Sequence, residues 1–209
     1  MKTIDCIDYY HIDKGIQQLK NISFNHYPNQ HIIFHVYWYG NITRKQLLPI
    51  KSYLATQNLN NTTLWIWLDV DNGYNQDNIN LIPNHNNIII KKYDPKIESS
   101  NTLLYNHPAI YEKKFIKFRS DLARLIVLYK YGGLYYDLDL ILLKNLDCIL
   151  DLEFCYQWSI LDKGNNAILR LKKNSPNSIQ LINKYIQTLK TKNFTISFNQ
   201  TIFTSEINI

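Results

Sequence analysis

Cysteine, arginine and long apolar runs are all scarce in this 209-residue chain. The three cysteines, Cys6, Cys148 and Cys155, are odd in number and lack metal-ligand spacing, which predicts reduced thiols and an intracellular protein. No apolar segment of a signal peptide follows the N-terminus, and the most hydrophobic stretch is interrupted at Lys130 and Asp137. We therefore expect no transmembrane segment and a cytoplasmic or otherwise intracellular location.

The formal net charge of +6 arises from 23 basic and 17 acidic residues, and most of the basic residues are lysines dispersed along the chain. A nucleic-acid-binding protein would gather them in a stripe with interleaved aromatic residues, so we expect no nucleic-acid partner. Hydrophobic residues make up 45% of the sequence, which is enough for a substantial core. Length and composition together predict one packed domain over residues 1–209.

Arginine is so rare here that its positions carry information. Only four occur, at positions 44, 119, 124 and 170, although lysine is abundant. Arg119 and Arg124 flank Asp121. Lysine cannot replace arginine where a planar, permanently charged fork is needed. The segment around Asp121 is therefore expected to require a fixed geometry.

Predicted strands and helices alternate along the chain. We expect strands over residues 31–39, 64–68, 87–91, 134–136, 154–158 and 167–171. Helices are expected over 13–20, from Pro49 to 56, over 111–131 and over 176–190, with a polar loop and one helical turn between 96 and 108. Gly132 is placed to end the third of these helices in a left-handed conformation. Short connections between alternating elements predict an α/β domain with a mostly parallel sheet.

Asp137-Leu138-Asp139 follows the strand predicted over 134–136 and precedes another apolar run. Residues two apart in an extended segment point to the same face, so both carboxylates are expected to aim at one point while Leu138 enters the core. Carboxylates that converge at a buried strand end suit a hard divalent cation. A structural role is the alternative, in which they cap backbone groups or pair with Arg119 or Arg124.

A second Asp-x-Asp sequence occurs at Asp69-Val70-Asp71. It runs into Asn72-Gly73, a turn-forming context that explains both aspartates without a ligand. Asp121 and Arg124 stand three residues apart on the long predicted helix, which is compatible with an ordinary intrahelical ion pair. That half of the helix is otherwise apolar, however, so buried charges with partners are expected there.

The block from Arg119 to Leu143, with Ser-Asp-x-x-Arg, a Tyr-Gly-Gly turn and Tyr-x-Asp-x-Asp, resembles the DXD sugar-binding region of glycosyltransferase family 32. Three flanking segments fit in order. Residues 34–40 resemble the first strand of that family, 64–69 its second strand, and Asn165 to Leu169 its asparagine-containing strand. The similarity covers residues 31 to 190, the expected core of the domain.

The resemblance implies a GT-A type nucleotide-sugar-binding fold and a UDP- or GDP-sugar donor. Asp121 would bind donor sugar hydroxyls, and Arg124 would bind the sugar or diphosphate. Asp137 would meet the ribose and the metal side, and Asp139 would be the direct ligand of Mn²⁺ or Mg²⁺. The other residues implied in substrate binding are Tyr37 and Trp38, beside the base, and Ser120, Gly133, Tyr136 and Asn166.

The implied activity is metal-dependent transfer of a hexose to a glycan, lipid or protein acceptor, with retention of configuration. Many relatives have a membrane anchor and further C-terminal segments, which are not seen in this chain; Glu206 is a candidate for a last metal ligand. Two alternatives remain open. One is a catalytically silent nucleotide-sugar- or glycan-binding module. The other is a phosphotransferase of the haloacid dehalogenase type, which normally has Thr or Val where this chain has Ile141.

Overall fold

The computed structural model describes residues 30–111, 116–158 and 163–191, so the helix predicted over 13–20 and the candidate ligand Glu206 lie outside the described residues. No helix within this part of the chain is both long and apolar enough to cross a membrane. The elements in chain order are β1 (Ile32–Trp38), α2 (Arg44–Thr56), β2 (Thr62–Asp69), α3 (Gln76–Leu81), β3 (Ile88–Tyr93), α4 (Pro95–Glu98), the 3₁₀ helix η1 (Pro108–Tyr111), α5 (Ile116–Tyr131), β4 (Gly133–Tyr136), the 3₁₀ helix η2 (Asp147–Ile149), β5 (Phe154–Trp158), β6 (Lys163–Leu171) and α6 (Pro176–Thr191).

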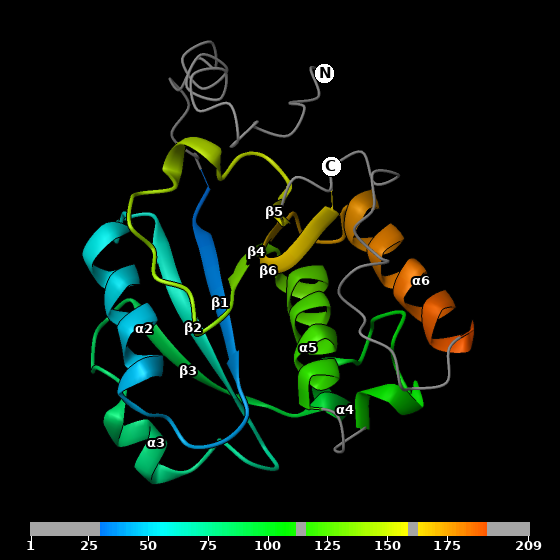
Figure 1. Ribbon diagram of the computed structural model, residues 1–209, viewed down its shortest axis with the longest axis horizontal. Helices are drawn as coiled ribbons and strands as arrows, with labels where there is room; N and C mark the ends of the chain where they lie inside the picture. The colour runs from blue at the N-terminus through cyan, green and yellow to red at the C-terminus, as the bar shows by residue number, and fades with distance from the viewer. Residues whose placement is uncertain (1–29, 112–115, 159–162, 192–209) are drawn as a thin grey trace.

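A six-stranded sheet with the order β3-β2-β1-β4-β6-β5 forms the centre of the molecule (Figure 1). β1 pairs in parallel with β2 and β4, and β2 pairs in parallel with β3. β6 runs antiparallel to both β4 and β5. The predicted α/β fold with a mostly parallel sheet is confirmed.

The direction in which the sheet grows reverses beside β1. The chain adds β2 and β3 on one side of β1 and then crosses through α5 to place β4 on the other side. Ligands of open α/β sheets bind at the carboxyl ends of the strands where the strand order reverses. The topology alone therefore points to the edge where β1 ends at Trp38 and β4 is followed by Asp137.

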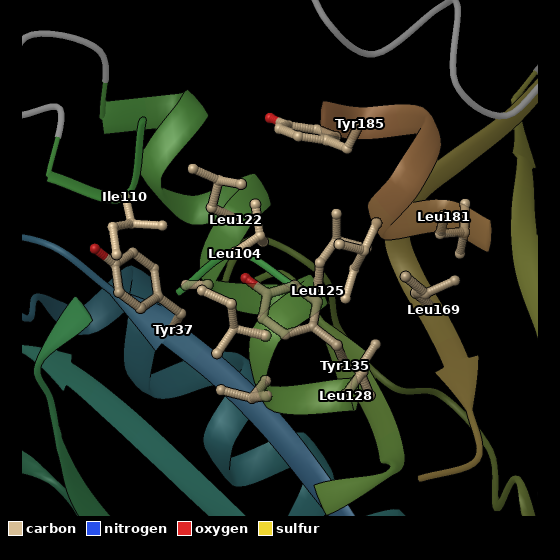
Figure 2. Packing of buried hydrophobic residues seen from close by; sticks show 14 of the residues in the cluster. Tyr37, Leu104, Ile110, Leu122, Leu125, Leu128, Tyr135, Leu169, Leu181 and Tyr185 are labelled. Atoms are coloured by element: carbon tan, nitrogen blue, oxygen red, sulfur yellow. The ribbon is translucent and has the colours of Figure 1, made fainter. Parts of the chain in front are cut away.

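Alternating side chains of the strands enter two separate cores, as expected for a sheet covered on both faces. Phe34, Leu134 and Tyr136 pack with side chains of α2. Tyr37 and Tyr135 point to the opposite face and pack with α5 and α6. Figure 2 shows Tyr135 among the leucines of α5, with Leu181 and Tyr185 of α6 on one side and Tyr37 next to Ile110 on the other.

Helix α2 begins at Arg44, so the start predicted at Pro49 was wrong. A capping box explains the difference: the side chain of Thr43 accepts from the first turn, and Gln46 accepts from the backbone N–H of Thr43 at 3.1 Å. Pro49 lies inside the helix and is buried against the sheet. The cap thus decides where the helix starts, despite the general cost of an interior proline.

The turn between α5 and β4 is a glycine pair, as predicted for the end of this helix. Gly132 has φ +66, and its N–H donates to the carbonyl of Leu128 at 2.8 Å. A side chain on Gly133 would overlap the carbonyl oxygen of Ile33 in the neighbouring strand. Only glycine therefore allows β4 to approach β1 this closely directly after a helix.

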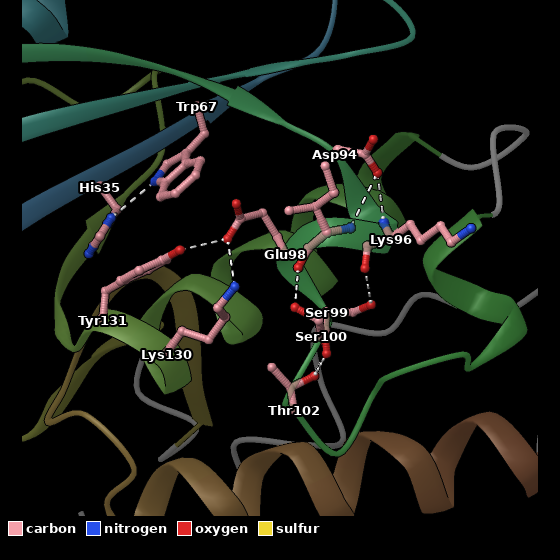
Figure 3. Close-up of polar contacts among 11 residues, drawn as sticks. His35, Trp67, Asp94, Lys96, Glu98, Ser99, Ser100, Thr102, Lys130 and Tyr131 are labelled. Carbon is pink, nitrogen blue, oxygen red and sulfur yellow. Dashed lines mark hydrogen bonds and ion pairs between the residues drawn. The ribbon is translucent and has the colours of Figure 1, made fainter.

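Buried polar groups fix this end of α5 (Figure 3). The indole N–H of Trp67 donates to Nδ1 of His35 at 3.0 Å, so the neutral imidazole carries its proton on Nε2 and donates it to the carbonyl of Gly132 at 2.8 Å. Burial lowers the pKa of His35 to about 4. Nearby, the hydroxyl of Tyr131 donates to the carboxylate of Glu98 at 2.9 Å.

Candidate active site

Helix α5 and strand β4 together explain why residues far apart in the motif meet. From Arg124 the chain follows the helix to Tyr131, about 11 Å at a rise of 1.5 Å per residue. After the glycine pair it returns along β4 for about 13 Å, at about 3.3 Å per residue, to reach Asp137. The two paths have similar lengths, so the middle of the helix lies beside the carboxyl end of the strand.

The buried guanidinium of Arg124 is the centre of this site. Its NH1 donates to the backbone carbonyl of Asn166 at 2.7 Å, and its NH2 donates to Oγ of Ser120 at 3.1 Å. NH2 also lies 3.2 Å from one carboxylate oxygen of Asp121 and 3.2 Å from one of Asp137. The contacts come from α5, from the residue that follows β4 and from β6, and they hold the planar group in one orientation.

Asp121 has one occupied and one available carboxylate oxygen. Its Oδ1 accepts from the side-chain amide of Asn166 at 2.9 Å and faces Arg124. Among the described residues no hydrogen bond reaches Oδ2. Burial raises the pKa of Asp121, while Arg124 and Asn166 oppose that rise.

Asp137 carries negative charge that its neighbours do not fully compensate. Burial, together with the charges of Asp139 and Asp121, raises the pKa of Asp137 to about 6, although Arg124 opposes the rise. The hydroxyl of Tyr135 forms hydrogen bonds with Asp137 and Ser120. We call Ser120, Asp121, Arg124, Tyr135, Asp137 and Asn166 the Arg124 cluster.

The segment Asp137-Leu138-Asp139 is a turn, so the prediction of an extended strand end was wrong. β4 stops at Tyr136, and the N–H of Leu140 donates to the carbonyl of Asp137 at 3.1 Å, which closes a β-turn. Leu138 enters the core as predicted, with 3% of its surface exposed. Asp139 is exposed and lies close enough to Asp137 to influence its ionisation. The two carboxylates remain neighbours despite the different backbone.

The donor set and charge of this turn fit a hard cation with oxygen ligands. Arg124 contributes one positive charge, whereas Asp121, Asp137 and Asp139 contribute three negative charges, which leaves an excess of negative charge at the turn. No group of three or more His, Cys, Asp or Glu side chains that could hold a metal occurs among the described residues. A cation here would therefore take further ligands from water, from a bound substrate or from parts of the chain outside the described ranges.

The second Asp-x-Asp sequence holds an arginine in place of a metal. Arg119 donates from Nε and NH2 to the two oxygens of Asp69 at 2.7 and 2.8 Å, and its NH2 lies 2.8 Å from Asp71. The hydroxyl of Tyr37 donates to the same Asp69 carboxylate at 2.6 Å. The predicted turn exists, because the N–H of Asp71 donates to Asp69 at 2.8 Å. The turn therefore explains only part of the role of Asp69 and Asp71, because both also pair with Arg119. The alternative in which Arg119 pairs with Asp137 or Asp139 was wrong.

Comparison with known proteins identifies the motif. Residues 54–155 match the family described as "Glycosyltransferase sugar-binding region containing DXD motif". Over these residues the chain is similar to the sugar-binding region of DXD glycosyltransferases. The predicted resemblance and enzyme class are confirmed, and Asp121, Arg124, Asp137 and Asp139 all lie within the matched range.

A curated protein is similar to a short part of the chain, and a solved structure is similar to most of it. The Arabidopsis thaliana protein At4g19900 is 34% identical over 73 residues, which are 35% of this chain and 11% of that protein, so the match spans about a tenth of this curated relative. The solved structure of PaToxG Glycosyltransferase superposes with a TM-score of 0.60 at 20% identity, covering 92% of this chain and 74% of that one. That similarity shows a shared fold.

Of the remaining residues predicted to bind substrate, Trp38 is partly exposed, whereas Tyr37, Gly133 and Tyr136 are buried. Trp38 lies half-buried at the end of β1, on the same edge of the sheet as the Arg124 cluster, and donates from its indole to the carbonyl of Asn41 at 3.0 Å. Tyr37 is buried, with its hydroxyl on Asp69. Gly133 lies at the opposite end of β4, and Tyr136 lies on the opposite face with its hydroxyl 3.3 Å from the carbonyl of Pro49. Their substrate-binding roles stay predictions.

Two tyrosines, one in the Arg124 cluster and one beside it, were missed by sequence reasoning. Tyr135 stands two residues before Asp137, and the rule of alternating faces could have placed its side chain on the Asp137 side of β4. Tyr185 on α6 is buried, and the charges of Asp121 and Arg124 influence its ionisation. No local pattern signals Tyr185, because it reaches the cluster only through the packing of α6 on α5.

Proposed function

We propose that the chain is a metal-dependent glycosyltransferase that moves a hexose from a UDP- or GDP-sugar to a glycan, lipid or protein acceptor. The observation that carries the proposal is the pairing of Arg124 with Asp121 and Asp137 at the reversal point of the sheet. The match of residues 54–155 to a sugar-binding region supports the same reading.

In this proposal the Arg124 cluster binds and orients the donor. The available Oδ2 of Asp121 accepts a sugar hydroxyl, while Asn166 and Arg124 keep its Oδ1 fixed. All three guanidinium nitrogens of Arg124 have partners in the protein, so this residue orders both carboxylates before the donor arrives. Such preorganisation lowers the cost of reaching the transition state, since the dipoles need not reorient during the reaction.

Asp137 and the exposed Asp139 would hold Mn²⁺ or Mg²⁺ together with the donor diphosphate. When bound, such a cation stabilises negative charge on the departing diphosphate. The excess negative charge at the turn supports this role, because a divalent cation would compensate it. Trp38, at the neighbouring strand end, is proposed to contact the base.

Transfer breaks the bond between the anomeric carbon and the phosphate oxygen and forms a bond from that carbon to the acceptor oxygen, whose proton passes to the departing diphosphate. We propose retention of configuration. In this proposal the carboxylate beside the donor sugar is that of Asp121. Its Oδ1 already contacts Asn166 and Arg124. A hydroxyl-binding role suits this fixed carboxylate.

The test is calorimetric binding and donor hydrolysis across a panel of UDP- and GDP-sugars, with and without Mn²⁺. We expect metal-dependent binding that Asp139→Ala reduces at least tenfold. Asp151→Ala is the matched control, because Asp151 is also exposed but lies outside the cluster. Binding that needs no metal, or that is unchanged in Asp139→Ala, would refute the proposal. Metal-dependent binding without turnover on any acceptor would favour the silent module.

A further inference from the structure

One surface beside the DXD turn combines basic and apolar side chains. Directly after the turn, residues 140–146 run alongside α2, as Figure 1 shows. The N–H of Leu142 donates to Oγ of Ser52 at 3.0 Å, and the carbonyl of Lys144 accepts from Gln57 at 2.9 Å. These bonds fix the segment along the side of the helix. Leu142 turns inward, so its neighbours Ile141 and Leu143 point away from the protein.

Exposed side chains of α2 have the same basic and apolar character as this segment. On α2, Arg44, Leu48 and Lys51 follow one another at spacings of four and three residues, which places them along one exposed face of the helix. Leu48 is 54% exposed, Ile141 53% and Leu143 82%. We call this surface, made up of Arg44, Leu48, Lys51, Ile141, Leu143 and Lys144, the α2 patch.

The charge of the patch has one sign. Neither α2 nor the segment 140–146 contains an acidic residue. Arg44, Lys51 and Lys144 have no ion-pair partner among the described residues. By contrast, each buried arginine of α5 pairs with carboxylates, so the free positive charge on this side of the molecule is not a by-product of the site.

Uncompensated cations around exposed aliphatic side chains suit a surface that is anionic outside and apolar just beneath. A lipid bilayer with anionic headgroups has that structure: basic residues meet the headgroups while leucine and isoleucine enter the boundary with the acyl chains. An acidic protein would meet the cations but leaves no reason for a leucine that is 82% exposed.

We propose that the α2 patch is a docking surface for membranes that contain anionic lipids. Docking would hold the Asp137–Leu140 turn next to the headgroup plane, since the patch begins immediately after that turn. The inference does not depend on the proposed transferase activity, because docking needs neither donor nor metal.

Co-sedimentation of the full chain with vesicles tests the proposal. The comparison is between phosphatidylcholine vesicles and vesicles with about one third phosphatidylserine, at low and at high salt. We expect binding to anionic vesicles only, weakened by salt as exposed charges are screened. Lys51→Gln with Lys144→Gln should weaken binding about 25-fold, at about fivefold per lysine. Ile141→Ser with Leu143→Ser should weaken it at least tenfold.

Matched variants separate the patch from the general positive charge of the chain. Lys172→Gln with Lys173→Gln removes the same charge from exposed positions at the end of β6, and Ile97→Ser removes an exposed isoleucine on α4. Both controls should keep wild-type binding. Equal losses in the patch and control lysine variants would overturn the proposal, as would absence of binding to anionic vesicles. Binding to a soluble acidic peptide but not to vesicles would also overturn it, in favour of a protein partner.

Discussion

Replacing Asp137 by asparagine is expected to stabilise the metal-free protein while removing its function. Burial and neighbouring negative charge raise the pKa of Asp137 from 3.8 to about 6, so its charged form is disfavoured in the folded state. This rise in pKa corresponds to about 3 kcal/mol at pH 8, where the carboxylate is fully ionised. The side chain is 28% exposed, and we therefore expect Asp137→Asn to raise the free energy of unfolding by about 1–2 kcal/mol after allowing for solvent screening.

The sign of the pH dependence follows from the raised pKa. A group whose pKa is higher in the folded state loses stabilisation as the pH rises from 3.8 to 6. The advantage of the asparagine variant should thus be full at pH 8, about half as large at pH 5, and nearly absent at pH 4.

Urea denaturation in EDTA at pH 8 and pH 5 measures this difference, with Asp151→Asn as the control. Wild-type protein should gain thermal stability on addition of Mn²⁺, whereas Asp137→Asn should not. A variant that is less stable than wild type at pH 8 would show that the Arg124–Asp137 contact outweighs the burial of charge, and the reasoning would fail.

Other predictions concern the two arginines, the histidine and the glycine pair. Arg119→Met should cost about 3–5 kcal/mol in urea denaturation, because it leaves the carboxylate of Asp69 buried and unpaired; a loss below about 1 kcal/mol would contradict this. Arg124→Lys should stay folded but lose at least tenfold in donor affinity by calorimetry, since an ammonium cannot make the same forked contacts; wild-type affinity would show that charge alone suffices. The lowered pKa of His35 makes wild type lose stability as the pH falls from 6.5 toward 4, so the difference in free energy of unfolding between wild type and His35→Gln should shrink by about 2 kcal/mol from pH 8 to pH 5. His31→Gln, which removes an exposed imidazole, is the control. A difference between wild type and His35→Gln that does not change with pH would refute the argument. Gly133→Ala should prevent β4 from pairing with β1 and lower the yield of folded protein; a thermal unfolding midpoint equal to that of wild type would contradict the close approach.

The sequence predicts those parts of the site that depend on local spacing. The helix, glycine pair and strand between Arg124 and Asp137 could be placed from periodicity, and their contact follows from the lengths of helix and strand. The turn at Asp137 was not foreseen because the segment lacks glycine and proline, and its aspartates, which also favour turns, were assigned to metal binding at a strand end.

Long-range partners are what the sequence could not supply. Asp69 and Arg119 are 50 residues apart, and their ion pair depends on β2 lying beside β1 and under the start of α5. The start of α2 differs from the prediction for another reason. The capping signal at Thr43 and Gln46 decides where the helix begins, whereas the prediction rested on Pro49.

The position of β1 in the sheet has a practical consequence for anyone who wants to excise the sugar-binding region. The range matched by the family, residues 54–155, contains β2, β3 and β4 but neither β1 nor β6. Those two missing strands are the neighbours of β4 on either side, and β1 also separates β4 from β2. A fragment with these boundaries would leave both edges of β4 and one edge of β2 unpaired, and these edges would favour aggregation. The smallest expressible unit should therefore start before Ile32 and continue through α6, well outside the limits that the motif suggests.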